Sequence, residues 1–152
     1  MQAEGNERSE MPGRNEHKFD ICILVDKCAL GDPKAIIEFD NLRTFHHTND
    51  VSTLIKPLQQ RADQSNTYAM CLLALIYKNS KTIKKDIKRA HELAKLAFQR
   101  RNMYGLNFIA SAYETGDELT TKNIDKAIKL YTWSADNGNA TAYERLGIIS
   151  FN

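Results

Sequence analysis

The feature that most constrains the fold of this chain is an internal repeat with a period of 36 to 37 residues. It is clearest between Gly105 and Gly138, where small and apolar residues recur at the spacing of one helix face. The recurring positions are Ala69, Leu73, Ala74 and Tyr77 in one unit, Gly105, Ile109, Ala110 and Tyr113 in the next, and Ala142, Leu146 and Gly147 in the third. A fixed period between about 20 and 50 residues is typical of solenoids, so the pattern predicts stacked pairs of antiparallel helices.

The central unit also carries its own helix start and stop signals. Gly116 can end the first helix because glycine adopts a left-handed backbone without steric cost. Asn123 precedes the second apolar set and is a candidate N-cap, and Gly138 marks the end of the second helix. Alanine and glycine recur where helices would cross, since only small side chains let two backbones approach closely. These signals predict one helical hairpin per unit.

The two central units resemble the Sel-1-like repeat, a relative of the tetratricopeptide repeat. The family pattern runs, loosely, Ala-x3-Leu-Gly-x2-Tyr-x2-Gly, then Asp, Lys-Ala, an aromatic residue and Ala-Ala-x2-Gly. The unit from Gly105 supplies Ile109, Ala110, Tyr113, Gly116, Lys126, Ala127, Tyr131, Ser134, Ala135 and Gly138. The unit from Ala69 supplies Leu73, Ala74, Tyr77, Asp86, Arg89, Ala90, Ala94, Ala97 and Phe98, but has Ser80 and Arg101 at the glycine positions. The resemblance implies an all-α, right-handed α-solenoid of antiparallel helix-turn-helix repeats that acts as a scaffold for protein–protein contacts.

The repeat register divides the chain into a tail and one helical domain. Residues 1–17 are polar and without periodicity, so we expect a disordered tail. Residues 18–152 form the predicted α-helical repeat domain, made of a capping helix (18–31), a degenerate repeat (32–68), two repeats (69–104 and 105–141) and a partial repeat or terminal helix (142–152). In the degenerate repeat, Asp32 is the expected N-cap of a helix from Pro33, and Pro57 must kink the second helix or delay its start to about Lys56.

The resemblance also implies that the protein binds its partner on the concave surface of the solenoid. The first helix of each unit lines that surface in related repeats. The candidate binding positions are Tyr68, Met70, Leu72, Tyr104, Asn107, Phe108 and Ser111. The expected partner is a protein or peptide held by a rigid scaffold. The last unit also carries apolar residues on its outer side, which points to self-association through the C-terminal helix or to a missing partner element.

A run of basic residues offers an alternative mode of binding. Residues 78–101 contain nine basic and two acidic residues, a net charge of +7, which leaves −5 for the rest of the chain. The stripe is expected at Lys84, Lys85, Lys88, Arg89 and Lys95. Such a stripe binds an acidic peptide, nucleic acid or an anionic membrane, or it is simply a solvated face. The lack of interleaved aromatic residues favours the solvated face over binding to nucleic acid.

The cysteines and histidines do not form a recognisable chemical motif. Cys22, Cys28 and Cys71 fit neither a zinc-site spacing nor a disulfide framework, so we expect small buried core residues. The loop pair His46–His47 lacks a third ligand, so we expect these two histidines to be solvated, and His17 and His91 are isolated in the sequence. No serine, cysteine or lysine has an activating context and there is no glycine-rich phosphate loop. We therefore expect a protein that is not an enzyme and that uses no metal or cofactor.

Composition is consistent with an ordinary domain. The 152 residues include 42% apolar residues, enough to bury a core, and the net charge is only +2. Residues 1–17 lack the apolar run of a signal peptide, and the longest apolar run, residues 69–77, is too short to cross a bilayer. From this we expect an intracellular, cytoplasmic protein.

Overall fold

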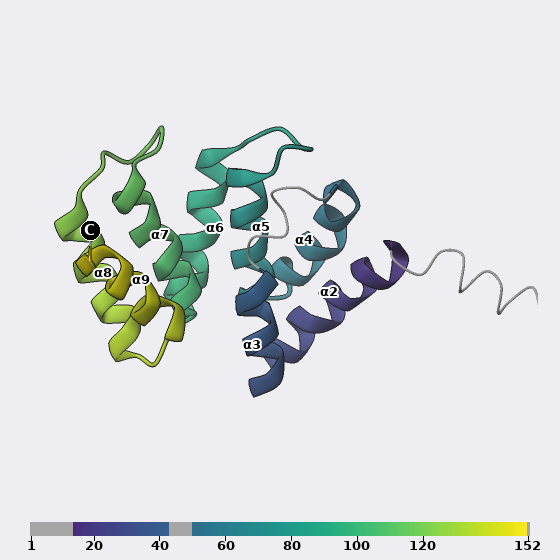
Figure 1. The fold of residues 1–152 in the computed structure, drawn as a ribbon. Helices are drawn as coiled ribbons and strands as arrows, with labels where there is room; N and C mark the ends of the chain where they lie inside the picture. Colours follow the sequence, from purple (N-terminus) through teal and green to yellow (C-terminus); the bar gives the residue numbers. More distant parts are fainter. Residues whose placement is uncertain (1–13, 43–49, 152) are drawn as a thin grey trace, which may run out of the picture.

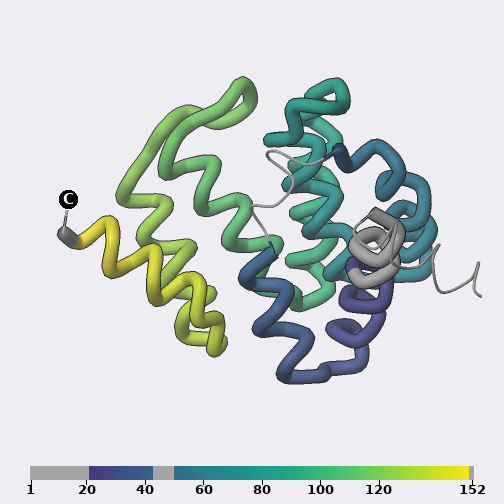
Figure 2. Tube along the Cα trace, turned by 45° about the vertical axis from the view of Figure 1, so that its right-hand side comes forward, coloured from purple at the N-terminus to yellow at the C-terminus, as the bar shows by residue number. Residues whose placement is uncertain are grey.

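The computed structural model describes residues 14–42 and 50–151, and within these ranges the chain consists of helices joined by loops (Figure 1). The elements are α2 (Arg14–Ala29), α3 (Pro33–Leu42), the 3-10 turn η2 (Ser52–Leu54), α4 (Ile55–Asp63), α5 (Thr67–Asn79), α6 (Ile87–Gln99), α7 (Met103–Thr115), α8 (Ile124–Asp136) and α9 (Ala140–Phe151). Helix α5 pairs with α6 and α7 pairs with α8, while α6 packs on α7 and α8 packs on α9 (Figures 1 and 2). The predicted all-α solenoid of helical hairpins is confirmed.

The same backbone turn joins each second helix to the next first helix. Four residues at these junctions have a positive φ and are followed directly by an N-cap residue. These pairs are Gly31–Asp32 (φ 84°), Ser65–Asn66 (φ 71°), Arg101–Asn102 (φ 70°) and Gly138–Asn139 (φ 90°). In each turn the N-cap amide donates to the carbonyl five residues earlier, at 2.9 to 3.2 Å. Arg101, which replaces the family's glycine, therefore keeps the left-handed turn that the repeat requires.

N-cap side chains then start the helices as their positions predict. The Asn123 side chain accepts from the Lys126 amide at 3.1 Å, and Asp32 accepts from the Lys34 amide at 3.0 Å. Pro57 is the third residue of α4, where its missing amide hydrogen costs no helical bond, so its predicted effect of delaying the helix is confirmed.

The helices cross closely at small residues. A Cβ added to Gly105 of α7 would lie 2.4 Å from the Ala94 carbonyl oxygen and 2.8 Å from the Phe98 amide nitrogen, both in α6. The equivalent residues of the neighbouring units, Ala69 and Ala142, are fully buried. The recurrence of small residues in the sequence therefore marks the contact points between successive hairpins.

The N-terminal region departs from the repeat. Helices α3 and α4 do not pair as a hairpin; α3 pairs with α2, and α4 packs on α5. The prediction of a degenerate hairpin over residues 32–68 is therefore wrong in this respect. Helix α2 also begins at Arg14, so residues 14–17 of the predicted tail are helical, while residues 1–13 lie outside the described part.

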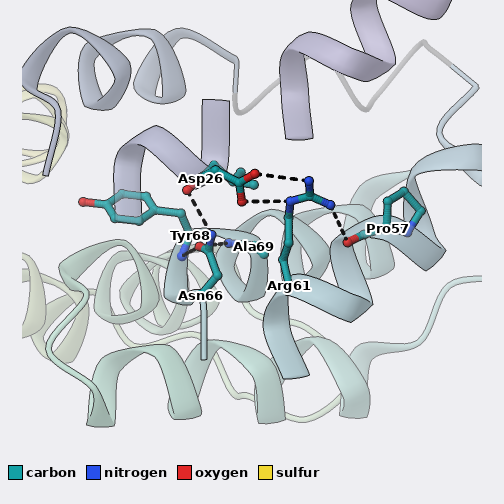
Figure 3. A network of polar contacts seen from close by, with 7 residues as sticks. Asp26, Pro57, Arg61, Asn66, Tyr68 and Ala69 are labelled. Atoms are coloured by element: carbon teal, nitrogen blue, oxygen red, sulfur yellow. Dashed lines mark hydrogen bonds and ion pairs between the residues drawn. The ribbon is translucent and has the colours of Figure 1, made fainter. Parts of the chain in front are cut away.

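Helix α2 is held by polar contacts to α4 and to the turn before α5 (Figure 3). The Arg61 guanidinium binds the Asp26 carboxylate through Nε at 2.9 Å and Nη2 at 3.1 Å, and also donates to the Pro57 carbonyl. The Asn66 side chain donates to the Val25 carbonyl at 3.0 Å. A bidentate arginine–carboxylate pair has strict geometry, so these contacts set the position of α2 against α4 and α5.

All three cysteines are buried, as predicted. Burial raises the pKa of the Cys71 thiol, and burial with the nearby charges of Asp32 and Glu38 raises that of Cys28 to about 12. Both thiols are therefore neutral at physiological pH and serve as apolar core groups.

The crossing at Gly105 predicts an asymmetric response to alanine. Gly105→Ala should lower the free energy of unfolding by about 1–3 kcal/mol, because the new methyl overlaps the α6 backbone. Gly147→Ala is the matched control: no atom lies within 4 Å of its added Cβ, and alanine favours helix, so stability should be unchanged or rise by up to about 1 kcal/mol. Chemical denaturation of both variants measures the difference; equal effects would contradict the proposed crossing.

Candidate functional site

A groove of about 470 Å³ opens on the side of the stack formed by the first helices α5, α7 and α9. Helix α7 forms its floor, α5 and α9 contribute to its walls, and Phe39 of α3 and Tyr131 of α8 also line it. From α7 the lining residues are Tyr104, Asn107, Phe108, Ser111, Glu114 and Thr115. The groove therefore joins residues from three repeat units in one surface.

The predicted binding positions divide into two groups in the structure. Tyr104, Asn107, Phe108 and Ser111 all line the groove, and Tyr68 lines a neighbouring hollow together with Tyr104. Met70 and Leu72 are 1% and 0% exposed, so their prediction as surface positions is wrong. The reason is that α5 is the central helix of the fold, in contact with α2, α4, α6 and α7. Within residues 14–42 and 50–151, α7 packs mainly against α5, α6 and α8, and α2 shares no extensive contact with it.

Helix α3 closes one end of the groove by crossing the starts of the first helices. The Phe39 ring packs edge-on against Tyr68 at 5.2 Å and Tyr104 at 5.1 Å between centroids. The adjacent Asp40 carboxylate accepts from the Tyr104 hydroxyl at 3.0 Å and from Thr141. Tyr68, Tyr104 and Thr141 occupy the same position in α5, α7 and α9, two residues after each N-cap. Burial and the Asp40 charge raise the pKa of Tyr104, which therefore stays a neutral donor.

A buried charged cluster lies at the other end of the groove. The His91 Nε2 atom lies 2.8 Å from Asp117 Oδ2, and the Lys78 Nζ atom lies 3.5 Å from the same oxygen. Lys78 Nζ also lies 4.9 Å from the centroid of the Phe108 ring, against which His91 packs edge-on. His91 is only 8% exposed, and this residue, isolated in the sequence, belongs to a buried polar cluster in the fold. Nothing local in the sequence pairs it with Asp117, because the two lie 26 residues apart on different elements.

The cluster keeps Asp117 ionised. Burial by itself raises the pKa of this carboxyl, but hydrogen bonds from His91 and the Leu119 amide, with the charges of His91 and Lys78, lower it to about 2. Since an ionised carboxylate only accepts, His91 must donate its Nε2 hydrogen to Asp117. The α7–α8 loop is thereby anchored to α5 and α6.

A second charged set lies where α7, α8 and α9 meet. The Glu114 carboxylate accepts from the Tyr131 hydroxyl at 3.0 Å and forms an ion pair with Arg145. Burial, followed by the Glu114 charge, raises the pKa of Tyr131, so its hydroxyl remains a donor. With Lys78 paired to Asp117 and Arg145 paired to Glu114, the charges along the groove are balanced.

The floor of the groove holds one buried acceptor without a donor. Asn107 is 7% exposed and donates through Nδ2 to Asn139 Oδ1 at 2.9 Å. Its Oδ1 atom has no hydrogen-bond partner among the residues that the structure describes. Buried polar atoms are nearly always hydrogen-bonded, so this oxygen is an unsatisfied acceptor beneath the surface of the groove.

The predicted basic stripe is not one helix face. Lys84 and Lys85 precede α6, and Lys85 pairs with Glu118 at 3.2 Å. Arg89 donates to the Gln59 side chain at 3.1 Å, which leaves Lys88 and Lys95 as the stripe residues exposed on α6. The five stripe residues therefore come from the loop before α6 and from α6 itself, and four of them, Lys84, Lys85, Lys88 and Lys95, are exposed.

The described residues contain neither a metal-binding cluster nor a membrane-spanning helix. Residues 14–42 and 50–151 contain no group of three or more histidine, cysteine or acidic side chains placed to hold a metal ion. None of the helices in these ranges combines the length and apolar character needed to cross a membrane. His46 and His47 lie outside the described residues.

Comparison with known proteins identifies the repeat units. The Sel1 repeat family model matches residues 67–102 and residues 104–139. These matches coincide with the hairpins α5–α6 and α7–α8 and agree with the resemblance seen in the sequence. No curated protein and no solved structure matches the chain.

The lowered pKa of Asp117 predicts a specific acid dependence of stability. The folded state favours the ionised carboxylate, so its contribution is present above about pH 4 and is lost as the pH falls toward 2. Asp117→Asn should cost about 2 kcal/mol of unfolding free energy near neutral pH and progressively less between pH 4 and 2. Urea denaturation of both proteins across this range measures the difference; a gap that is the same at pH 6 and pH 2.5 would exclude the ion pair as its source.

Proposed function

Since this chain is a Sel-1-like repeat protein, we propose that it is a non-enzymatic scaffold that binds a protein or peptide partner in the groove formed by α5, α7 and α9. Sel1 repeats generally serve as modules for protein–protein interaction and are typically not catalytic.

The observation that carries the proposal is the composition of the groove floor. Tyr104 and Ser111 are partly exposed and offer an aromatic ring and a hydroxyl, whereas Phe108 and Asn107 lie deeper, at 5% and 7% exposed. A peptide can place apolar side chains against the Tyr104 ring and form a hydrogen bond with the Ser111 hydroxyl. A groove of about 470 Å³ suits a short peptide segment rather than a whole domain surface.

The balanced charges of the groove predict how such a partner is held. Both cations that line it, Lys78 and Arg145, are engaged by carboxylates. Affinity should therefore come from buried apolar surface and hydrogen bonds, and it should depend only weakly on salt. Binding to nucleic acid or to an anionic membrane through Lys88 and Lys95 remains the alternative, and it would weaken steeply as salt rises.

A peptide library displayed on phage and selected against the full chain provides a ligand for the test. Ser111→Trp places a large side chain in the groove and should weaken binding of a selected peptide at least tenfold, with the melting temperature retained. Ser52→Trp is the matched control, because Ser52 is exposed and does not line the groove. Isothermal titration calorimetry measures each affinity.

The same peptide distinguishes binding in the groove from electrostatic binding through Lys88 and Lys95. The double variant Lys88→Glu/Lys95→Glu should bind it as the wild type does, at low and at high salt. Full binding by Ser111→Trp, or loss of binding in the double lysine variant, would exclude the groove as the binding site.

A further inference from the structure

The loops inside the two central hairpins lie at the same end of the molecule, opposite the turns that join one hairpin to the next (Figures 1 and 2). Residues 80–86 join α5 to α6, and residues 116–123 join α7 to α8. An ion pair between Lys85 and Glu118, at 3.2 Å, links the two loops directly. We call these loops, together with the first turns of α6 and α8, the loop end; it comprises residues 80–88 and 116–126.

The α7–α8 loop forms a tight turn that holds an apolar side chain in solvent. The Asp117 and Thr120 backbones exchange two hydrogen bonds, at 2.9 and 3.2 Å, and Asp117 Oδ1 accepts from the Leu119 amide at 2.9 Å. The other carboxylate oxygen of Asp117 contacts His91 of α6 and Lys78 of α5. Leu119 is nevertheless 59% exposed. The fold therefore fixes the position of this leucine without burying it.

Lysines share the loop end with this leucine. Six lysines are exposed there, and three exposed carboxylates leave a surplus of three positive charges. Two of these carboxylates are already engaged, because Glu118 pairs with Lys85 and Asp86 accepts from the Arg89 amide at 3.0 Å. The exposed lysines are Lys81, Lys84, Lys85, Lys88, Lys122 and Lys126.

A hollow of about 310 Å³ opens beside Leu119. Lys122, Lys126, Thr121 and Tyr113 line it together with Leu119. The Lys126 Nζ atom lies 4.9 Å from the centroid of the Tyr113 ring, and the Lys122 side chain is exposed. The hollow thus combines two cations and hydroxyl groups with an apolar side chain, which is the combination that a phospholipid offers a complement to: an anionic headgroup next to acyl chains.

We propose that the loop end docks on the surface of a membrane that contains anionic phospholipids. Leu119 enters the boundary between headgroups and acyl chains, and the hollow between Lys122 and Lys126 receives a headgroup phosphate. The remaining lysines are attracted by the negative surface, each of them contributing to the affinity.

The shape of the loop end favours a planar partner over a strand. Both loops project beyond the helices that they join, so a flat surface can contact them together (Figure 2). A single-stranded nucleic acid would be expected to stack its bases on aromatic rings, and residues 80–88 and 116–126 contain none. An apolar side chain at the tip, as at Leu119, contributes to binding only where it enters an apolar layer.

Docking through the loop end goes beyond the proposed binding of a peptide and does not depend on it. None of residues 80–88 and 116–126 lines the groove. A scaffold docked in this way would hold its peptide partner at the membrane surface.

Co-sedimentation of the full chain with lipid vesicles tests the role of the lysines. We expect binding to phosphatidylcholine vesicles that contain about 30% phosphatidylserine, no binding to phosphatidylcholine alone, and a steep loss of binding as salt rises. Lys81→Gln/Lys84→Gln should weaken binding at least about tenfold. The matched control Lys27→Gln/Lys34→Gln removes two exposed lysines beside the α2–α3 turn, at the opposite end of the molecule, and should bind as the wild type does.

The same assay tests the apolar contact. Leu119→Ser should weaken binding at least about fivefold with the melting temperature unchanged, because the side chain that enters the lipid is lost. Leu30→Ser is the matched control, since Leu30 is 87% exposed at the α2–α3 turn. Trp133 is the single tryptophan of the chain, so Leu119→Trp combined with Trp133→Phe reports insertion directly. Its fluorescence emission should shift to shorter wavelength on anionic vesicles.

Three outcomes would overturn the proposal. The first is a lack of binding to the anionic vesicles, and the second is an equal loss of binding in the loop-end variants and their controls. The third is tighter binding to single-stranded poly(U) than to vesicles, unaffected by Leu119→Ser, which would assign the lysines to nucleic acid. Ser111→Trp, which fills the groove, should bind vesicles as the wild type does, so the vesicle and peptide experiments fail independently of each other.

Discussion

The close approach of successive helices at small residues is the constraint on which the rest of the structure depends. At Gly105 the α7 backbone lies so near α6 that a single methyl group would meet the Ala94 carbonyl oxygen at 2.4 Å. The left-handed turn before each first helix brings the chain into this crossing. Because both features recur with the period of the sequence, each hairpin meets the next in the same way, and a continuous surface forms along α5, α7 and α9.

The irregular first unit decides how much of that surface remains open. Helix α3 pairs with α2 rather than α4, and it places Phe39 between Tyr68 and Tyr104 while Asp40 receives hydrogen bonds from Tyr104 and Thr141. One helix thus contacts equivalent positions of three successive first helices. The groove therefore opens along α5, α7 and α9 beyond the place where α3 crosses them, and its charges are balanced within the protein. A partner that binds there must match shape and hydrogen bonds more than charge.

The groove determines what a partner must bring. Its partly exposed residues include Tyr104 and Ser111, which suit a peptide that packs an apolar side chain on the ring and forms a hydrogen bond with the hydroxyl. The polar groups around them are engaged within the protein, with Lys78 bound to Asp117 and Arg145 bound to Glu114.

The sequence by itself determined the two central helical hairpins and four of the groove residues, Tyr104, Asn107, Phe108 and Ser111. These depend on local signals, namely periodicity, caps and small residues, which are written along a single segment. Whether a residue of a first helix is exposed depends instead on which distant segment covers it. That is why Met70 and Leu72 proved buried, why His91 lies against Asp117, and why Lys85 and Arg89 of the basic stripe contact residues of other elements. Only the tertiary structure could decide these points, because each rests on contacts between segments whose pairing is not encoded in a local pattern.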